Sequence, residues 1–463
     1  MNKCCAQTQT GEYKTIVYII CLSAALGGLL FGLDQGFIAN SVETIKSQYG
    51  LNTTGIEKYS AILAIGGIVG ASLSGFLSRF LGRKKSLVLA GVIFSFGSLL
   101  SALLPSIGIL TVLRFTLGFG VGLASFVAPL YLSETAPAAI RGAMGTLFQL
   151  MITIGIFLIS VSNVLLSSYF TDTRIALPLM FLVITLFAIL MLVTSIFLPE
   201  SPRWLMLKGK KNEAIQALQQ TLNNQNEVTA EIQEIEKILS MEKPSIRNTI
   251  SLGFIKVLLI GIALQMFQQL VGINMMIYYT PTIFGYAGMK GLVATMTVPT
   301  VNMLFTFPAI FLVEKWGRKK LLYFGALFML LTMLVAGLAF QYIGNATDPT
   351  LISSLPKHAL LIAIIFYIFG FAISWGPVVW LVCSEIFPLQ GREIGMTVTT
   401  IVNWTFAGLV MRYALSFMET YGNHMIFYVF SIFCVLAIIF VYKFVPETKG
   451  LTLEKLEIQL NRK

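Results

Sequence analysis

Long apolar runs separated by short polar segments make up most of the chain. Many runs are about 20 residues long, the length that crosses the hydrocarbon core of a bilayer as an α-helix. The runs lie roughly at residues 15–40, 60–79, 86–104, 108–132, 143–168, 177–198, 255–285, 291–313, 321–343, 359–383, 394–418 and 425–445. A transmembrane barrel would instead alternate apolar and polar residues over about ten positions. The pattern predicts an all-α membrane protein with twelve transmembrane helices.

The composition supports a membrane protein. Of the 463 residues, 56% are hydrophobic and 11% are charged, whereas soluble domains carry about 25% charged residues. The five cysteines are too few for a secreted disulfide scaffold. The first run is too long for a signal peptide and no cleavage site follows it, so we expect it to remain as a helix.

The positions of the basic residues predict an orientation. The net charge is +11, and Lys and Arg gather in alternate connections, near Arg83, Lys210 and Arg318 and in the C-terminal tail. The positive-inside rule then predicts that both termini and the central segment are cytoplasmic. We expect a multi-pass protein of a plasma or bacterial inner membrane. Because topology explains the charge, we expect the lipid bilayer and no nucleic acid as a partner.

A polar stretch near the middle divides the chain into two sets of six runs. We predict an N-terminal six-helix bundle at 1–198, a cytosolic linker at 199–254 and a C-terminal six-helix bundle with a short cytosolic tail at 255–463. Apolar residues at helical spacing within 211–224 and 228–240 predict short amphipathic helices in the linker.

Three motifs occur in the same order in both halves. Gly-Arg-Lys-Lys follows the second and eighth runs, a Glu and an Arg at equal spacing follow the fourth and tenth, and Pro-Glu-Ser or Pro-Glu-Thr ends the sixth and twelfth. This order indicates an internal duplication. Two halves with the same topology predict a parallel pseudo-two-fold axis along the membrane normal, with a transport path between them.

Charged residues of these motifs lie at predicted cytosolic helix ends. Guanidinium–carboxylate pairs are directional and join helix ends, so we expect a cytosolic gate, although the cations could also serve only to set topology. The gate candidates are Arg83, Glu134, Arg141, Glu200, Glu314, Arg318, Glu385, Arg392 and Glu447.

Asp34 and Arg114 are ionisable residues inside the apolar runs. Asp34 lies well after the cytosolic start of the first run, and Arg114 lies equally far before the cytosolic end of the fourth. At 1.5 Å rise per residue, both reach the same depth in the outer half of the membrane and can pair. A permanent ion pair and a proton-binding site both fit this placement.

The seventh run contains amides within an apolar span. Gln265, Gln268 and Gln269 share one helical face, whereas Asn274 lies off it unless the helix breaks near Gly272. Neutral amides both donate and accept hydrogen bonds, as sugar hydroxyls require. Buried glutamines also join helices, but so many in one turn favour a binding site.

These motifs resemble the sugar porter family of the major facilitator superfamily. The likeness is strongest to bacterial sugar–proton symporters of the xylose, galactose and arabinose type, with facilitative glucose transporters further off. Arg79 departs from the family pattern, which usually has an acidic or amide residue there. The matching segments are 27–36, 79–85, 114–142, 199–205, 267–281, 314–320, 374–388, 401–406 and 446–450.

The resemblance implies a carrier that moves a monosaccharide, hexose or pentose, together with a proton. It assigns proton coupling to Asp34 and Arg114, because coupled members carry Asp at this position of the first helix and facilitative members commonly Asn. It also implies a substrate-binding set of Phe31, Gln149, Gln268, Gln269, Asn274, Asn302, Trp380 and Asn403.

Three other functions compete with symport. A facilitative sugar uniporter of the same fold is the main alternative, and a transporter-like sensor would carry longer cytosolic tails. An enzyme lacks support, because no nucleophile–base constellation or metal-ligand spacing occurs. We expect no catalytic residue, no metal, no cofactor besides the proton gradient, and a monomer.

Overall fold

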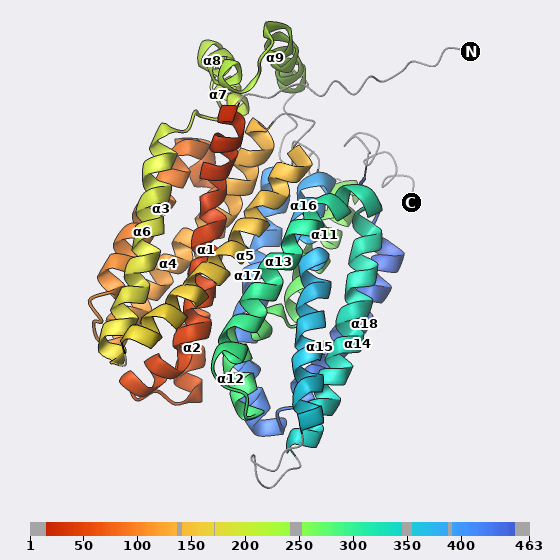
Figure 1. Cartoon of the computed structure of the whole chain (residues 1–463). Coiled ribbons are helices and arrows are strands. Elements are labelled where there is room, and N and C mark those ends of the chain that lie inside the picture. Colours follow the sequence, from red (N-terminus) through yellow and green to blue (C-terminus); the bar gives the residue numbers. More distant parts are fainter. Residues whose placement is uncertain are drawn as a thin grey trace.

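The computed structural model describes residues 15–136, 141–170, 172–240, 252–344, 354–387 and 391–449. These residues form helices and no β-strand. Twelve stretches of the described chain are long and apolar enough to cross a membrane, so the predicted number of spans is confirmed. Helices α1–α6 lie on one side of the molecule and α11–α18 on the other, with α7–α9 beyond one end (Figure 1).

Most of the spans are longer than the apolar runs that predict them. The first half contains α1 (Thr15–Gln48), α2 (Thr53–Leu81), α3 (Arg83–Ser101), α4 (Ile107–Thr135), α5 (Arg141–Tyr169) and α6 (Thr173–Phe197). Helix α2 begins before its apolar run because Asn52 caps it, accepting a hydrogen bond from Gly55 N at 2.8 Å. Helices therefore continue beyond the apolar stretch into polar surroundings.

Two spans of the second half each consist of two helices. This half contains α11 (Leu252–Leu270), α12 (Ile273–Tyr286), α13 (Leu292–Trp316), α14 (Arg318–Gly344), α15 (Ser354–Ile373), α16 (Trp375–Ile386), α17 (Arg392–Tyr421) and α18 (Met425–Phe444). The break at Gly272 is confirmed, since its φ of +99° lies in the left-handed region. The break at Ser374 was not predicted. Pro377 follows in the first turn of α16, where its missing N–H leaves no helical bond unmade.

The turn between α2 and α3 recurs between α13 and α14. Gly82 and Gly317 have φ values of +94° and +86°, which favour glycine. In each turn a carboxylate, from Glu200 or Glu447, fills the space where a side chain on the glycine would stand. The duplicated sequence motif thus corresponds to a duplicated local structure. We call the end of the molecule that carries these two turns the basic end.

Helices α1 and α5 approach closely beside the centre of the molecule. A Cβ atom on Gly28 or Gly32 would collide with the backbone of Phe148 or Ile152, and one on Gly155 would collide with Leu29. Small residues allow such backbone approach between membrane helices. This close packing fixes the position of α1 relative to α5 on the side of the first half that faces the second half.

The linker forms three short helices, α7 (Pro202–Leu207), α8 (Lys211–Thr221) and α9 (Gln225–Ser240). The amphipathic pattern predicted the last two but not α7. Their apolar faces form a small core that includes Leu205, Leu218 and Ile232. Trp204 Nε1 donates to the carbonyl of Arg79 at 3.0 Å and so joins α7 to the end of α2. The boundaries at 198 and 254 remain a prediction.

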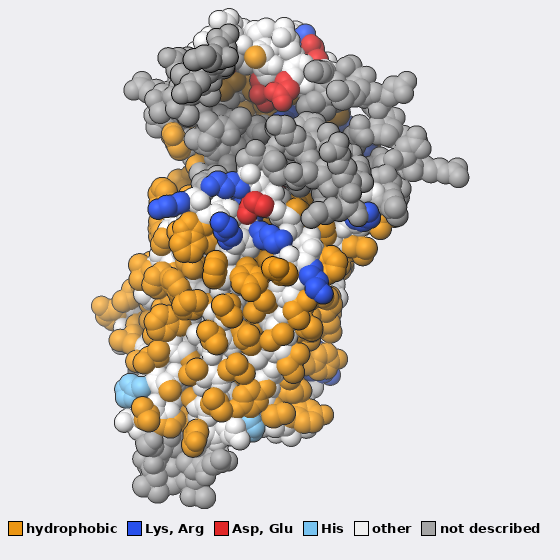
Figure 2. All heavy atoms as spheres, turned by 90° about the vertical axis from the view of Figure 1, so that its right-hand side faces the viewer, with side chains coloured by type: hydrophobic (Ala, Val, Ile, Leu, Met, Phe, Trp, Pro, Cys, Tyr) orange, Lys and Arg blue, Asp and Glu red, His pale blue; other side chains and the backbone are white. Residues whose placement is uncertain are grey.

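Exposed hydrophobic side chains cover the length of the spans. Figure 2 shows them over one long face, with Lys and Arg gathered near the end where α7–α9 lie. On α14 and α18, residues such as Phe324, Leu331 and Ile439 are exposed. A surface of this kind suits lipid contact, so the twelve spans identify a multi-pass membrane protein.

Candidate functional site

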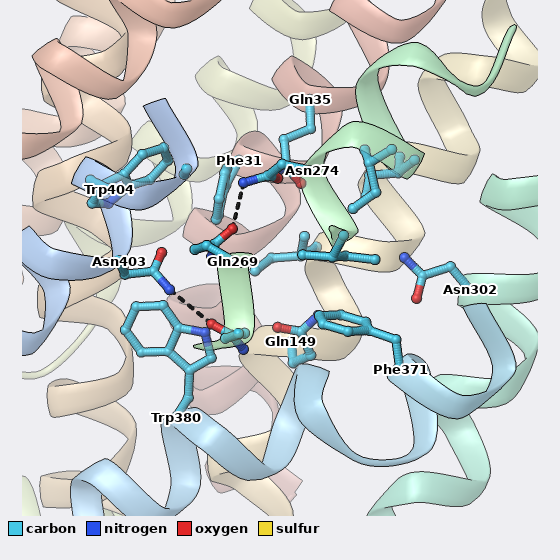
Figure 3. A pocket seen from close by; sticks show the side chains of 16 residues that line it. Phe31, Gln35, Gln149, Gln269, Asn274, Asn302, Phe371, Trp380, Asn403 and Trp404 are labelled. Atoms are coloured by element: carbon cyan, nitrogen blue, oxygen red, sulfur yellow. Dashed lines mark hydrogen bonds between the residues drawn. The ribbon is translucent and has the colours of Figure 1, made fainter. Parts of the chain in front are cut away.

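A cavity lies between the two halves, near the middle of the spans (Figure 3). It is lined by Phe31, Gln35, Gln149, Ile152, Ile156, Gln268, Gln269, Ile273, Asn274, Ile277, Asn302, Phe371, Trp380, Asn403, Trp404 and Ala407. The space open to the centres of water molecules is about 50 Å³, several times the 10–15 Å³ that one water needs. All eight residues predicted to bind substrate lie in this lining.

The break at Gly272 brings Asn274 into the amide cluster. In a regular helix Asn274 would point away from Gln268 and Gln269. In the structure Asn274 Nδ2 donates to Gln269 Oε1 at 2.6 Å. The freed carbonyl of Val271 accepts a hydrogen bond from Tyr367 Oη at 3.0 Å, which satisfies the broken backbone. The interrupted helix therefore supplies three amides to one wall.

Asn403 of α17 connects the amides of α11. Its Nδ2 donates to Gln265 Oε1 at 2.6 Å and to Gln268 Oε1 at 2.8 Å. Gln268 Nε2 in turn donates to the carbonyl of Trp375 at 2.8 Å. Gln265 does not line the cavity, so it supports Asn403 from behind. This network fixes the orientation of the amides before any ligand binds.

The break at Ser374 aims Trp380 at the cavity. Helix α16 starts anew after Ser374, and Trp375 Nε1 donates to the carbonyl of Leu322 at 2.9 Å. Trp380, farther along α16, places its indole beside Asn403 and the amides of α11 (Figure 3). A large ring at this position offers a flat apolar face next to hydrogen-bonding groups.

The first half contributes a wall of mixed character. The rings of Phe31 on α1 and Trp404 on α17 lie 5.1 Å apart, so aromatic packing joins the two halves at one side of the cavity. Ile152 and Ile156 add apolar surface, and Gln149 adds an amide. Sugars present both hydroxyls and apolar C–H faces, which suits such a lining.

Some lining residues were missed by sequence reasoning. Gln35 carries the same signal as the amides of the seventh run, but as a single amide beside Asp34 it was overlooked. Nothing in the sequence marks Phe371 and Trp404 as lining residues, because aromatic residues are common throughout apolar runs.

Two lining residues carry buried polar atoms that have no hydrogen-bond partner among the described residues. These atoms are Asn302 Oδ1 and Trp404 Nε1. Buried polar groups in proteins are normally satisfied. An acceptor and a donor that remain open in the same cavity are available to a polar ligand.

Asp34 and Arg114 form an ion pair inside the first half. Asp34 Oδ1 lies 2.5 Å from Arg114 Nη1, and both side chains are at most 1% exposed. The guanidinium also lies over the ring of Tyr59, 5.7 Å from its centre. Asp34 Oδ2 and Arg114 Nε and Nη2 have no partner among the described residues. A pair this buried and this sparsely bonded is costly, which favours a functional role over a structural one.

The two basic-end clusters have the same design. In the first half Arg83 Nε and Nη2 each donate a hydrogen bond of 2.9 Å to the Glu134 carboxylate. Glu200 accepts hydrogen bonds from the backbone N–H groups of Arg83 and Lys84. Burial raises the pKa of the Glu200 carboxyl, and hydrogen bonds from backbone N–H groups oppose this. Ser201 Oγ donates to Glu134.

The second half repeats these contacts with Arg318, Glu385 and Glu447. Arg318 Nη2 lies 2.8 Å from Glu385 Oε1, and Glu447 Oε1 accepts from Arg318 N at 2.9 Å. Thr448 takes the place of Ser201, donating to Glu385 at 2.5 Å. Six of the predicted gate residues thus pair within their own half.

One described pair at the basic end crosses between the halves. Arg83 Nη2 lies 3.3 Å from Glu393 Oε1 at the start of α17. Glu393 was not predicted as a gate residue, because the duplicated motif ends at its neighbour Arg392. Arg392 and Glu393 line a second, smaller cavity with Ser133 and Ser384. The side chains of the gate candidates Arg141 and Glu314 lie outside the described residues.

The opposite end also carries contacts between the halves. Glu57 on α2 is fully buried and accepts from Arg412 Nη1 at 3.2 Å and from Ser416 N at 2.8 Å, both on α17. Thr53 Oγ1 donates to Glu419 Oε1 at 2.6 Å. Contacts between the halves therefore lie on both sides of the central cavity.

The arrangement defines a membrane carrier of the major facilitator superfamily fold, with a polar cavity between two halves. Residues 20–460 match the family described as "Sugar (and other) transporter". The chain belongs to this family of sugar transporters, which are not enzymes.

Named relatives agree along nearly the whole chain. The galactose-proton symporter of Escherichia coli K12 is 38% identical over 467 residues, covering 98% of this chain and 97% of the relative. The arabinose-proton symporter of the same strain is 35% identical over 446 residues, covering 95% and 93%. Both relatives are proton-coupled sugar carriers by name.

Solved structures of the xylose transporter XylE have the same fold. XylE bound to 6-bromo-6-deoxy-D-glucose matches with a TM-score of 0.83 and 32% identity, covering 96% of this chain and 99% of that one. Inward-open XylE from E. coli, also 32% identical and covering the same shares, gives 0.76.

Proposed function

We propose that this protein is a monosaccharide–proton symporter that works by alternating access. The observation that carries the proposal is the combination of two sites on one helix. Helix α1 contributes Phe31 and Gln35 to an amide-lined cavity, and Asp34 to a buried ion pair with Arg114. A sugar site and a titratable site so close together suit a carrier that couples the two.

The cavity residues divide the recognition of a sugar between them. Gln149, Gln268, Gln269, Asn274, Asn302 and Asn403 are the proposed hydrogen-bonding residues. Neutral amides both donate and accept, so they match hydroxyls without the desolvation cost of a charge. Trp380 and Phe31 then contact the apolar C–H face of the ring. The proposed substrate class is a monosaccharide, either a hexose or a pentose.

Asp34 is the proposed proton-binding residue. While charged, its carboxylate is held by Arg114 of α4, and this pair fixes α1 against α4. When Asp34 is neutral the attraction falls to that of an ordinary hydrogen bond, so α1 is released. Protonation thereby changes the balance between outward-open and inward-open states, as coupling requires.

The basic end is the proposed cytosolic end, by the positive-inside rule. The Arg83–Glu134 and Arg318–Glu385 pairs would then order the inner mouth within each half. Arg83–Glu393 would join the halves in the closed state and separate in the open one, and the remaining gate candidates would assist. In this proposal the chain acts as a monomer of two bundles, 1–198 and 255–463, joined by the linker at 199–254. It uses the proton gradient and no bound cofactor.

The experiment is a sugar panel on purified protein in liposomes that contain a pH-sensitive dye. We expect one or more of D-galactose, D-glucose, L-arabinose and D-xylose to enter and to acidify the interior. Sugar entry without any pH change would support a facilitative uniporter instead. Absence of entry for every monosaccharide would contradict the substrate class.

A further inference from the structure

Gln35 lies between the ion pair and the cavity. It follows Asp34 directly on α1, is 5% exposed and lines the cavity together with Phe31. Asp34 itself is fully buried and does not line the cavity. Any displacement of this turn of α1 therefore moves Gln35 and Asp34 together.

Gln35 also begins a chain of three amides. Its Nε2 donates to Asn274 Oδ1 at 3.4 Å, and Asn274 Nδ2 donates to Gln269 Oε1 at 2.6 Å (Figure 3). The first of these bonds joins the two halves, and it is much longer than the second. A bond of 3.4 Å is weak. A sugar hydroxyl, which donates and accepts, can replace it at little cost.

We propose that Gln35 is a sugar-contacting residue through which the charge on Asp34 sets the affinity for sugar. This inference rests on the symport proposed above. With Asp34 charged, Arg114 holds this turn of α1 toward α4 and keeps Gln35 at the far limit of hydrogen bonding to Asn274. With Asp34 neutral, Gln35 moves toward Asn274 and the sugar. By reciprocity, bound sugar then favours the protonated carboxyl by the same factor.

The surroundings of Asp34 support a single titrating group. The charged or titratable residues near it are Arg114 of α4, Tyr59 of α2 and Tyr278 of α12. Phenols are neutral near pH 7 and guanidinium groups stay charged. The other helices packed on this part of α1 carry no titratable residue within 144–168 or 175–197.

Gln149 provides a matched control within the same cavity. It is also a glutamine of the first half that lines the cavity, but it lies on α5 and not beside the ion pair. Substitution of Gln149 should weaken sugar binding without changing its dependence on pH. Substitution of Gln35 should change both.

The test measures sugar affinity of the full chain in detergent at about pH 5.5 and about pH 8.5, on either side of neutrality. The probe is D-galactose, or the tightest-binding sugar of the panel above. For the parent we expect binding about tenfold tighter at the lower pH, a usual size for coupled sites. For Gln35→Leu we expect weaker binding and a ratio below about twofold. Gln149→Leu should weaken binding yet keep the parental ratio.

The outcomes separate this inference from the symport itself. A parental ratio retained in Gln35→Leu would overturn the role of Gln35 and leave symport intact. A parent whose sugar affinity ignores pH, and which takes up no proton on adding sugar, would contradict symport. If Gln35→Leu does not fold, Gln35→Asn keeps an amide but shortens its reach, and its ratio should fall between parent and twofold.

Discussion

Glu57 on α2 and Arg412 on α17 form an ion pair of 3.2 Å that joins the two halves at the end opposite the basic end. Glu57 is fully buried, and Ser416 supplies two further donors to its carboxylate. Breaking a buried pair by removing one partner is strongly destabilising for the state that contains it. In the proposed orientation the pair therefore stabilises closure of the outer mouth.

We predict that Glu57→Gln shifts the population toward the outward-open state. The measurement is the labelling rate of a cysteine placed at Thr282 near the outer end of α12, in a background without native cysteines. We expect labelling about fivefold faster than in the parent, a usual size for a shifted two-state equilibrium. Glu213→Gln is the control, because that carboxylate is exposed and pairs with Lys210 within the linker. Equal rates in both variants would contradict a latch at Glu57.

At the basic end, Glu393→Gln should have the opposite effect. Among the described pairs there, Arg83–Glu393 is the one that crosses between the halves. Its loss should favour the inward-open state and speed labelling of Ser384→Cys, which lines the second cavity. Glu385→Gln leaves Arg318 less well paired within its own half and should produce a smaller shift in the same direction. A larger effect from Glu385 than from Glu393 would contradict this assignment.

Gln268→Ala and Trp380→Ala should each weaken sugar binding without unfolding the protein. Gln268 lines the cavity and also bonds Asn403 and the carbonyl of Trp375, so its loss disturbs two further groups. We expect about a tenfold to hundredfold loss of affinity by calorimetry, as for the loss of buried hydrogen bonds. Asn163→Ala is the control, since Asn163 is an amide bonded to Asn40 outside the cavity. Unchanged affinity in both cavity variants would contradict the site.

Arg114→Ala should be more damaging than Asp34→Asn. The first change leaves a carboxylate buried without its partner, whereas the second keeps the hydrogen-bonding shape and removes the charge. We expect Arg114→Ala to lose folded protein in size-exclusion chromatography, and Arg114→Ala with Asp34→Asn to regain it. Failure of the second substitution to restore folding would show that Arg114 has another structural partner.

Much of the fold followed from the sequence, because bilayer thickness dictates the length of an apolar run. Residues whose chemistry is unusual for their surroundings were also found, such as Asp34, Arg114 and the amides of the seventh run. The break at Ser374 was missed, since Ser and Gly-Pro also occur within continuous membrane helices.

The contacts between the halves were the least predictable part. Glu57 lies before the apolar run of α2, where a charge usually faces the headgroups or solvent. Arg412 lies within the eleventh apolar run, as Arg114 lies within the fourth, but neither Arg412 nor Glu393 could be paired from the sequence, because their partners are hundreds of residues away. Motifs within one half repeat, but the pairs that cross between halves have no duplicated counterpart to reveal them.

In the proposed mechanism sugar and proton move together, and Asp34 carries the proton. Its most direct measurement is the alkalinisation of a weakly buffered medium when sugar is added to energy-depleted cells that express the protein. The parent should produce a sugar-dependent rise in external pH, and Asp34→Asn should produce none while sugar counterflow continues. A parent without any rise would contradict symport, and a full-sized rise in Asp34→Asn would contradict the role of Asp34.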